Sequence, residues 1–113
     1  LRLYRRLAEL ESPEQVAEMA QELADRFGPL PPPAQNLMLQ LRLKALARRA
    51  GIAAIGVENG RLVLRPAGTE YANLEQLRAR LEGRATVTRR DICLPLDRGW
   101  PERLAEVLAL LAD

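Results

Sequence analysis

The chain has 113 residues, of which 48% are hydrophobic and 28% charged, and its formal net charge is +2 at pH 7. This composition fits a single globular domain over residues 1–113, and the small net charge excludes the strongly basic balance of a dedicated nucleic-acid-binding protein. No apolar run approaches the ~20 residues that a membrane-spanning helix needs, and no signal-peptide pattern is present. The lone cysteine, Cys93, cannot form an internal disulfide and suits a reducing cytoplasm. We therefore expect a cytoplasmic domain, and because the chain starts at Leu1 we interpret it as part of a larger protein.

The residue types that most often carry catalysis are missing. There is no histidine, which removes the commonest general base and metal ligand. Ser12 is the only serine, and a role in capping a helix accounts for it. No glycine-rich loop has the spacing that binds phosphates. We therefore expect no catalytic residue, no metal and no cofactor.

The first predicted elements are a short helix over residues 2–11 and a sharply delimited helix over residues 13–27. Ser12 and Gln15 have the spacing of a capping box, in which each side chain accepts a hydrogen bond from the other residue's backbone N–H. Gly28 closes the second helix, because glycine accepts the left-handed conformation that ends many helices. Both ends of this helix are therefore predicted from local chemistry.

The helix over residues 13–27 has an apolar face and an acidic face. At 100° per residue, the face predicted to point into the core consists of Val16, Met19, Ala20, Leu23 and Phe27. The opposite face carries a row that we call the acidic stripe: Glu14, Glu18, Glu22 and Asp25. Glu22 and Asp25 stand near the helix C-terminus, where the macrodipole disfavours anions, and only Arg26 is placed to relieve them locally. The stripe is either a solvated face or a surface that binds a partner.

A third helix is predicted over residues 34–50, after an extended, proline-stiffened connection over residues 30–33. It carries two apolar faces, with Ala34, Leu37, Met38, Leu41 and Ala45 on one and Leu39, Leu43, Leu46 and Ala50 on the other. A helix that is apolar on two sides is usually buried between neighbours, so we expect this one to be central. Gly51 is expected to end it.

The second half of the chain predicts two strand pairs and two helices. In chain order these are strands over residues 52–58 and 61–65, a helix over 70–81, strands over 85–89 and 92–96, and a helix from Pro101. Asn59-Gly60 between the first two strands is the strongest short-range hairpin signal. The core residues expected from the two helices are Tyr71, Leu74, Leu77, Leu81, Leu104, Val107, Leu108 and Leu111. The order is ααα-ββ-α-ββ-α, and hairpin-linked strands imply an antiparallel sheet packed on helices, so the fold class is α+β.

Five arginines cluster on and after the predicted helix over residues 70–81 and along the strand that follows it. They are Arg78, Arg80, Arg84, Arg89 and Arg90. They are either a patch that binds a phosphate backbone or a solvated face whose long stems cover apolar surface. The few aromatic residues (Tyr4, Phe27, Tyr71 and Trp100) are scattered, and three of them are expected in the core. Because aromatic side chains that would stack on bases are scarce, the solvated face is favoured.

The end of the acidic helix resembles a family motif. Residues 22–31, E-L-A-D-R-F-G-P-L-P, resemble the E-L-x-D-R-F-G-x-L-P motif in the C-terminal domain of bacterial transcription-repair coupling factors. Residues 1–8, L-R-L-Y-R-R-L-A, resemble the R-L-x-L-Y-K-R-I segment that opens that domain. Residues 34–55 resemble its next helix and the G-I-x-x-I strand that follows, whereas the last third of the chain matches loosely.

This resemblance implies the C-terminal regulatory domain of a larger ATP-dependent DNA translocase, which displaces stalled RNA polymerase and recruits excision repair through UvrA. In that family the domain is not the motor. It packs against an N-terminal UvrB-like module and masks the surface that UvrA binds. By position in the motif, Glu22 and Asp25 would face that module, with Arg26 beside them and Glu18 a less certain neighbour, and residues 1–11 would be a linker helix from the motor.

A rival interpretation assigns the function to the arginine cluster. In that case the chain would be a module that contacts nucleic acid or RNA polymerase through Arg78, Arg80, Arg84, Arg89 and Arg90. An autoinhibitory domain should bind DNA weakly or not at all, so a salt titration of DNA binding separates the two. In either case the isolated domain is expected to be a monomer without membrane contact.

Overall fold

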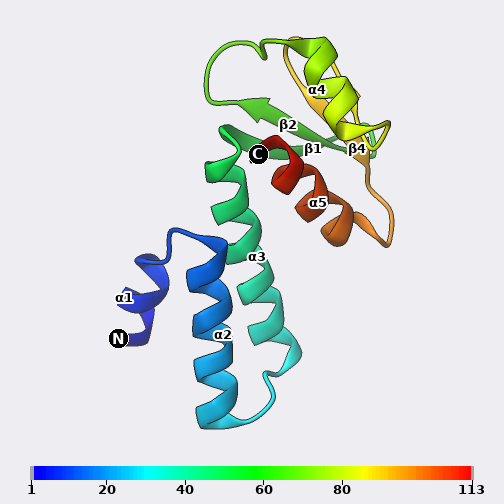
Figure 1. The fold of residues 1–113 in the computed structure, drawn as a ribbon. Coiled ribbons are helices and arrows are strands. Elements are labelled where there is room, and N and C mark those ends of the chain that lie inside the picture. Colours follow the sequence, from blue (N-terminus) through cyan, green and yellow to red (C-terminus); the bar gives the residue numbers. More distant parts are fainter. Residues whose placement is uncertain (1, 113) are drawn as a thin grey trace. The chain divides into compact units, whose positions relative to one another are not determined.

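The computed structural model describes residues 2–112, with side chains from residue 5 onward. Its elements are α1 (Arg2–Ala8), α2 (Pro13–Phe27), α3 (Pro32–Arg49), β1 (Ile52–Glu58), β2 (Arg61–Pro66), α4 (Leu74–Leu81), β3 (Thr86–Val87), β4 (Ile92–Pro95) and α5 (Trp100–Ala112) (Figure 1). The predicted α+β class and the order ααα-ββ-α-ββ-α are confirmed. The chain divides into two compact units, Leu1–Leu46 and Ala47–Asp113. The first is helical, and the second contains the sheet, α4 and α5.

Helix α2 begins and ends where its capping residues predicted. The Gln15 backbone N–H donates to Ser12 Oγ at 3.1 Å, and the Ser12 N–H donates to Gln15 Oε1 at 3.3 Å, which completes the capping box. At the other end Gly28 has φ +83°, and its N–H donates to the Ala24 carbonyl at 2.8 Å. These bonds satisfy several of the backbone groups at the two helix ends that have no partner within the helix.

The core of the first unit forms between α2 and α3. Its buried members are Val16, Met19 and Met38, and the partly buried side chains packed on them are Leu7, Leu10, Ala20, Leu23, Leu30 and Leu41. Phe27 was predicted to belong to this face, but it is 75% exposed. Among the described residues, the side chains of α2 that pack on this core end at Leu23, and the core continues with Leu30 beyond the Gly28 turn, so Phe27 stays outside it.

Two boundaries in the first unit differ from the prediction. Helix α1 ends at Ala8 and not at residue 11, because the Glu11 N–H is taken by the Gln15 side chain at 2.8 Å as the chain enters the capping box. Helix α3 begins at Pro32, so the predicted extended connection over residues 30–33 is two residues too long. Proline fits the first turn of a helix because the N–H groups there have no intrahelical partner.

Helix α3 buries residues from both of its predicted faces. Its buried side chains are Met38, Leu43, Ala45, Leu46 and Ala47. Leu37 was expected to be inside, but it is 42% exposed. Gly51, with φ +77°, follows the helix as predicted, and its N–H donates to the Arg48 carbonyl at 3.2 Å.

The second unit is built on a four-stranded antiparallel sheet in the order β1-β2-β4-β3. Asn59 (φ +53°) and Gly60 (φ +73°) both have positive φ in the β1-β2 turn, as the Asn-Gly signal predicted. In the register, Leu62 lies opposite Leu94, and Leu64 lies opposite Ile92. These four side chains share one face of the sheet and are 5% exposed or less.

Helices α4 and α5 complete this core. Leu104, Val107 and Leu108 of α5 are at most 2% exposed, which confirms its predicted stripe, and Leu111 is partly buried. Leu81 of α4 is fully buried, as predicted. The apolar side chains of the sheet thus pack against residues far away along the chain.

Helix α4 is shorter than predicted, because Tyr71 is held outside it. The Tyr71 N–H donates to the Arg89 carbonyl at 2.6 Å, and its hydroxyl donates to the Leu64 carbonyl at 2.8 Å. Asn73, with φ +55°, then precedes the helix, which begins at Leu74 and not at residue 70. Of the other aromatic residues, Tyr71 and Trp100 are partly buried, and the Tyr4 side chain lies outside the described residues.

The second strand pair is also shorter than predicted. β3 contains Thr86 and Val87 only, and β4 ends at Pro95. Thr88 leaves the ladder to form a local turn, in which its backbone N–H donates to the Asp91 carbonyl at 2.9 Å and its hydroxyl donates to Asp91 Oδ1, also at 2.9 Å. A threonine and an aspartate at this spacing favour a turn over continued pairing.

Candidate interaction surface on the acidic helix

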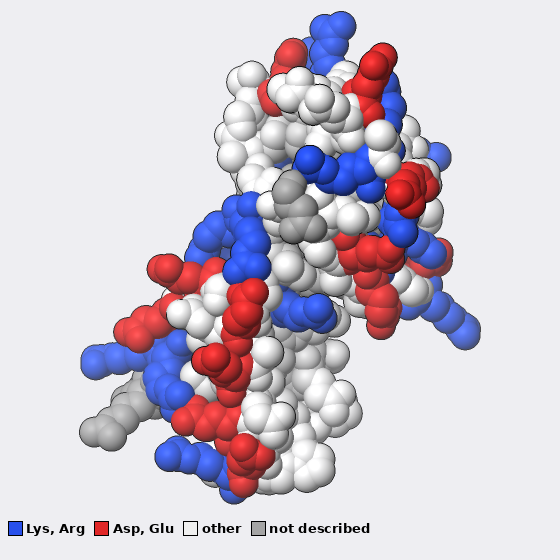
Figure 2. Space-filling view, viewed as in Figure 1, with Lys and Arg blue, Asp and Glu red and all other residues white. Residues whose placement is uncertain are grey.

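The acidic stripe lies on the outer side of the first unit. Figure 2 shows acidic side chains following one another in a column over the helices of residues 1–46. Glu18 and Asp25 are exposed, and the Glu22 side chain is 38% exposed. Capping of α2 by Ser12 and Gln15 sets the helix register, which in turn fixes these carboxylates on the face opposite Val16 and Met19.

Two of the carboxylates have partners that were not predicted, one on α1 and one a turn away on α2. Arg6 of α1 donates from Nη2 to Oε2 of Glu22 and forms an ion pair with it. Gln21 donates from Nε2 to Oδ1 of Asp25 at 2.9 Å, one turn earlier on α2. The sequence predicted that only Arg26 would offset the negative charge of Glu22 and Asp25 locally. That prediction is wrong, because Arg6 and Gln21 are their partners. Arg26 itself is exposed at the end of the helix.

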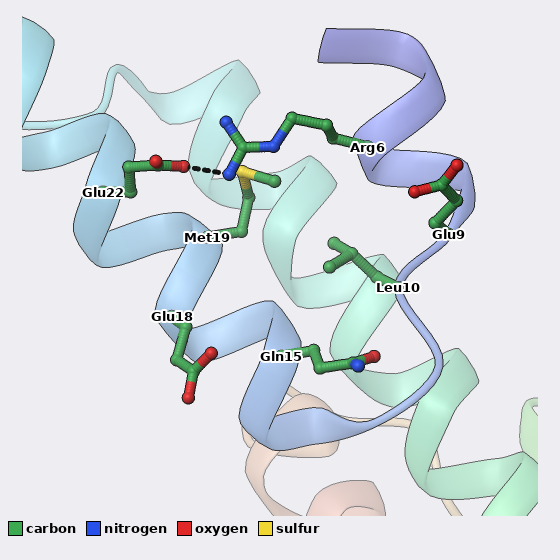
Figure 3. Close-up of a pocket in the computed structure, with 7 residues that line it drawn as sticks. All are labelled: Arg6, Glu9, Leu10, Gln15, Glu18, Met19 and Glu22. Carbon is green, nitrogen blue, oxygen red and sulfur yellow. Dashed lines mark hydrogen bonds and ion pairs between the residues drawn. The ribbon is translucent and has the colours of Figure 1, made fainter. Parts of the chain in front are cut away.

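The Arg6–Glu22 pair spans a shallow groove between α1 and α2. The groove has a volume of about 430 Å³ and is lined by Arg6, Glu9, Leu10, Gln15, Glu18, Met19 and Glu22. Figure 3 shows Arg6 extending from α1 toward Glu22, whereas Glu9 and Glu18 stand at other parts of the rim. Three carboxylates and one guanidinium therefore line it, which makes the local potential negative.

Arg6 and Glu9 are functional candidates that the sequence did not single out. They lie on or directly after α1, and their relation to Glu22 arises only when α1 folds back beside α2. Periodicity along one helix carries no signal for such a contact. Both partners of the Arg6–Glu22 pair are substantially exposed (48% and 38%), so the pair contributes only about 0.2–1 kcal/mol.

The arginines of the cluster differ in their hydrogen-bonding partners. Arg78 donates from Nη2 to the Val87 carbonyl at 3.0 Å and thus joins α4 to β3. Arg84 pairs with Glu106 of α5 and with Glu82. The hydrogen bond to Glu106 is the main reason that the pKa of Arg84 is raised above its ordinary value. Arg78 and Arg84 therefore hold elements of the second unit together.

Arg78, Arg80, Arg89 and Arg90 are exposed, whereas Arg84 is partly buried. Arg80 is on α4, whereas Arg89 and Arg90 are in the loop between β3 and β4. The backbone carbonyl of Arg89 is engaged by Tyr71. The five residues thus do not act as one uniform set, because two of them have structural partners in the second unit.

Other candidate chemistry is sparse. Cys93 is partly buried on β4, and burial raises the pKa of its thiol, which disfavours the reactive thiolate. Among residues 2–112, no group of three or more His, Cys, Asp or Glu side chains could hold a metal ion. Within the same range, no helix has the length and apolar character to cross a membrane.

Comparison with known proteins assigns the family. The family model described as the TRCF domain matches residues 1–77, which include α1, α2, the groove and Glu22 and Asp25. The transcription-repair-coupling factors of Mycobacterium bovis and Mycobacterium tuberculosis are each 46% identical to the chain over 52 residues. That segment is 46% of this chain but only 4% of either relative. The chain belongs to the TRCF domain family.

Proposed function

We propose that this chain is the non-catalytic, autoinhibitory C-terminal domain of a transcription-repair coupling factor. In this role residues 1–113 hold the N-terminal UvrB-like module of the same protein and mask its UvrA-binding surface. The contact is released when the parent DNA translocase engages stalled RNA polymerase. The observation that carries this proposal is the position of the acidic stripe: its exposed end lies within the segment that matches the TRCF domain.

The local electrostatics support a cationic partner for Glu22 and Asp25. Both stand in the last two turns of α2, where the helix dipole disfavours negative charge. Asp25 has a neutral hydrogen-bond donor, Gln21, and the charge of Glu22 is only partly balanced by an exposed arginine on α1. Basic side chains on the UvrB-like module would relieve this charge, and Arg26 would lie beside the contact. Glu18, one turn earlier, is a less certain member.

The strength of such a contact suits a reversible switch. Each exposed charge pair contributes about 0.2–1 kcal/mol, so two pairs change the closed population several-fold without fixing it. Polar pairs at an interface rim also set orientation and rate of association more than affinity. The rearrangement of the parent protein on stalled polymerase can therefore open the contact. The domain would act in the cytoplasm, as a monomer when isolated.

The alternative is a nucleic-acid or RNA polymerase contact through Arg78, Arg80, Arg84, Arg89 and Arg90. The structural partners of Arg78 and Arg84 weaken it, because a phosphate-binding surface needs side chains free to pair with phosphates. A salt titration of DNA binding by the isolated chain separates the two functions. The autoinhibitory function predicts weak binding whose dependence on salt is shallow.

The proposal is tested by UvrA binding to the full-length parent protein without ATP. Replacing Glu22 and Asp25 with alanine should loosen the contact and raise the affinity for UvrA several-fold, while the domain stays folded because neither side chain belongs to the core. The matched control replaces two exposed acids of the second unit, Glu75 and Glu102, and should leave UvrA affinity unchanged. Equal affinities for the wild type and the Glu22/Asp25 variant would contradict the proposal.

A further inference from the structure

The Arg6–Glu22 ion pair joins the start of the chain to the carboxylate that the proposed function assigns to the partner. Arg6 lies on α1, a helix of seven residues. The α1 segment is attached to the core of the first unit through Leu7 and Leu10, which are only partly buried. Among the side chains that the structure describes, Leu7 and Leu10 supply the apolar contacts of this segment, and the Arg6–Glu22 pair adds an exposed ionic one.

Arg6 and a cationic partner would compete for the same carboxylate. A guanidinium binds a carboxylate best with two parallel hydrogen bonds, one to each oxygen. Arg6 already donates to Oε2 of Glu22. An arriving arginine or lysine would lose that oxygen and would also be repelled by the Arg6 charge. The Glu22–partner contact is consequently weaker while Arg6 is in place.

We propose that α1 is an internal competitor of the UvrB-like module for Glu22, so that the seated α1 weakens the autoinhibitory contact and its departure strengthens it. This inference rests on the proposed function, since it concerns the regulation of the same site. Helix α1 is suited to such control because it is short and lies beside α2 at the edge of the groove. A movement that draws α1 away from α2 removes Arg6 from Glu22 and leaves the carboxylate to the partner.

The competing interpretation is that the Arg6–Glu22 pair holds α1 against α2 and thereby keeps the acidic stripe in the conformation that binds the partner. The two interpretations predict opposite signs. If Arg6 competes, Arg6→Gln frees Glu22, tightens the contact and lowers UvrA affinity. If Arg6 supports the stripe, the same substitution loosens the contact and raises UvrA affinity. Glutamine is shorter and lacks the guanidinium, so it removes both the charge and the hydrogen bond to Glu22, and the sign of the change in UvrA affinity tells the two interpretations apart.

The experiment measures UvrA affinity of the full-length parent without ATP for Arg6→Gln, Glu22→Gln and the double variant. We expect Arg6→Gln to lower UvrA affinity about two- to fivefold, as the loss of one exposed competing pair predicts. Glu22→Gln should raise it, and adding Arg6→Gln to Glu22→Gln should then have no further effect, because the two residues act through one contact. The control is Arg5→Gln, which removes an exposed charge from the same helix and should leave the affinity unchanged.

Each outcome bears on a different part of the account. If Glu22→Gln raises UvrA affinity but Arg6→Gln leaves it unchanged or raises it, internal competition is wrong and the proposed function stands. If neither the Glu22 nor the Glu22/Asp25 variant changes UvrA affinity, the proposed function itself fails. Circular dichroism and thermal unfolding of residues 1–113 carrying each substitution verify that the domain remains folded.

Discussion

The charged residues of the acidic stripe and of the arginine cluster differ in the groups that they pair with. Glu22 has a cationic partner on another helix, Asp25 has a neutral one on its own helix, and Glu18 is exposed one turn before Glu22 on the stripe. Arg84 and Arg78, by contrast, link elements of the second unit. Similar side chains therefore have different effects on stability and on binding, and the following substitutions separate those effects.

Glu18→Ala should change the free energy of unfolding by less than about 0.5 kcal/mol, or raise it, because it relieves repulsion within the acidic stripe. Glu22→Ala also removes the ion pair with Arg6 and should lower the free energy of unfolding by up to about 1 kcal/mol. Urea unfolding of residues 1–113 measures both values. A loss of more than about 2 kcal/mol for Glu18→Ala would show that this carboxylate has a structural role.

Asp97 should make stability depend on acid pH. Its pKa is lowered, first by the hydrogen bond from Arg103 at 2.7 Å and also by the Gly99 N–H. A carboxyl whose folded-state pKa lies below its unfolded value stabilises the fold above the unfolded pKa, and this contribution is lost as pH falls through the folded one. Asp97→Asn should therefore unfold more easily than wild type at pH 7, and the difference should shrink below about pH 4. A difference that stays constant down to pH 2 would contradict this assignment.

At the scale of elements, local chemistry predicted the ends of α2 and the β1-β2 turn correctly. Ser12, Gln15 and Gly28 act on backbone groups within a few residues, so their effect can be read from spacing. What the sequence did not reveal depends on distant partners. Tyr71 leaves the predicted helix because the carbonyls of Leu64 and Arg89 are available only after the sheet has formed.

The candidate site divides in the same way. The row of carboxylates on α2 follows from helical periodicity and was predicted in full. The Arg6–Glu22 contact and the groove depend on the packing of α1 beside α2, which neither helix specifies by itself. The exposure of Phe27 has the same origin, since an apolar face along a helix becomes core only where another element covers it.

The central strand β2 should dominate the stability of the second unit. Leu64 is fully buried opposite Ile92, whereas Val57 on the edge strand β1 is 60% exposed. Leu64→Ala should therefore cost about 2–5 kcal/mol, and Val57→Ala less than about 1 kcal/mol. Chemical denaturation of both variants tests this contrast. Equal costs would mean that β1 is covered to the same extent as β2.

At the scale of the whole molecule, family membership extends over residues 1–77, and the two-unit division places the acidic stripe in the helical unit. The second unit supplies a separate core of sheet and helices. In the proposed function the first unit carries the partner contact, and both units together form the regulatory domain. This assignment predicts that the isolated chain turns over no ATP, and a coupled-enzyme ATPase assay on a pure sample checks it.

The most direct test of the central claim is calorimetric titration of residues 1–113 with the isolated UvrB-like module of the parent protein. The account predicts measurable binding that weakens as salt rises, and a Kd raised about two- to thirtyfold by Glu22→Ala with Asp25→Ala. The Glu75→Ala and Glu102→Ala control should bind like wild type. No binding by the folded wild-type chain, or an equal Kd for the Glu22/Asp25 variant, would contradict the claim that the acidic stripe holds the module.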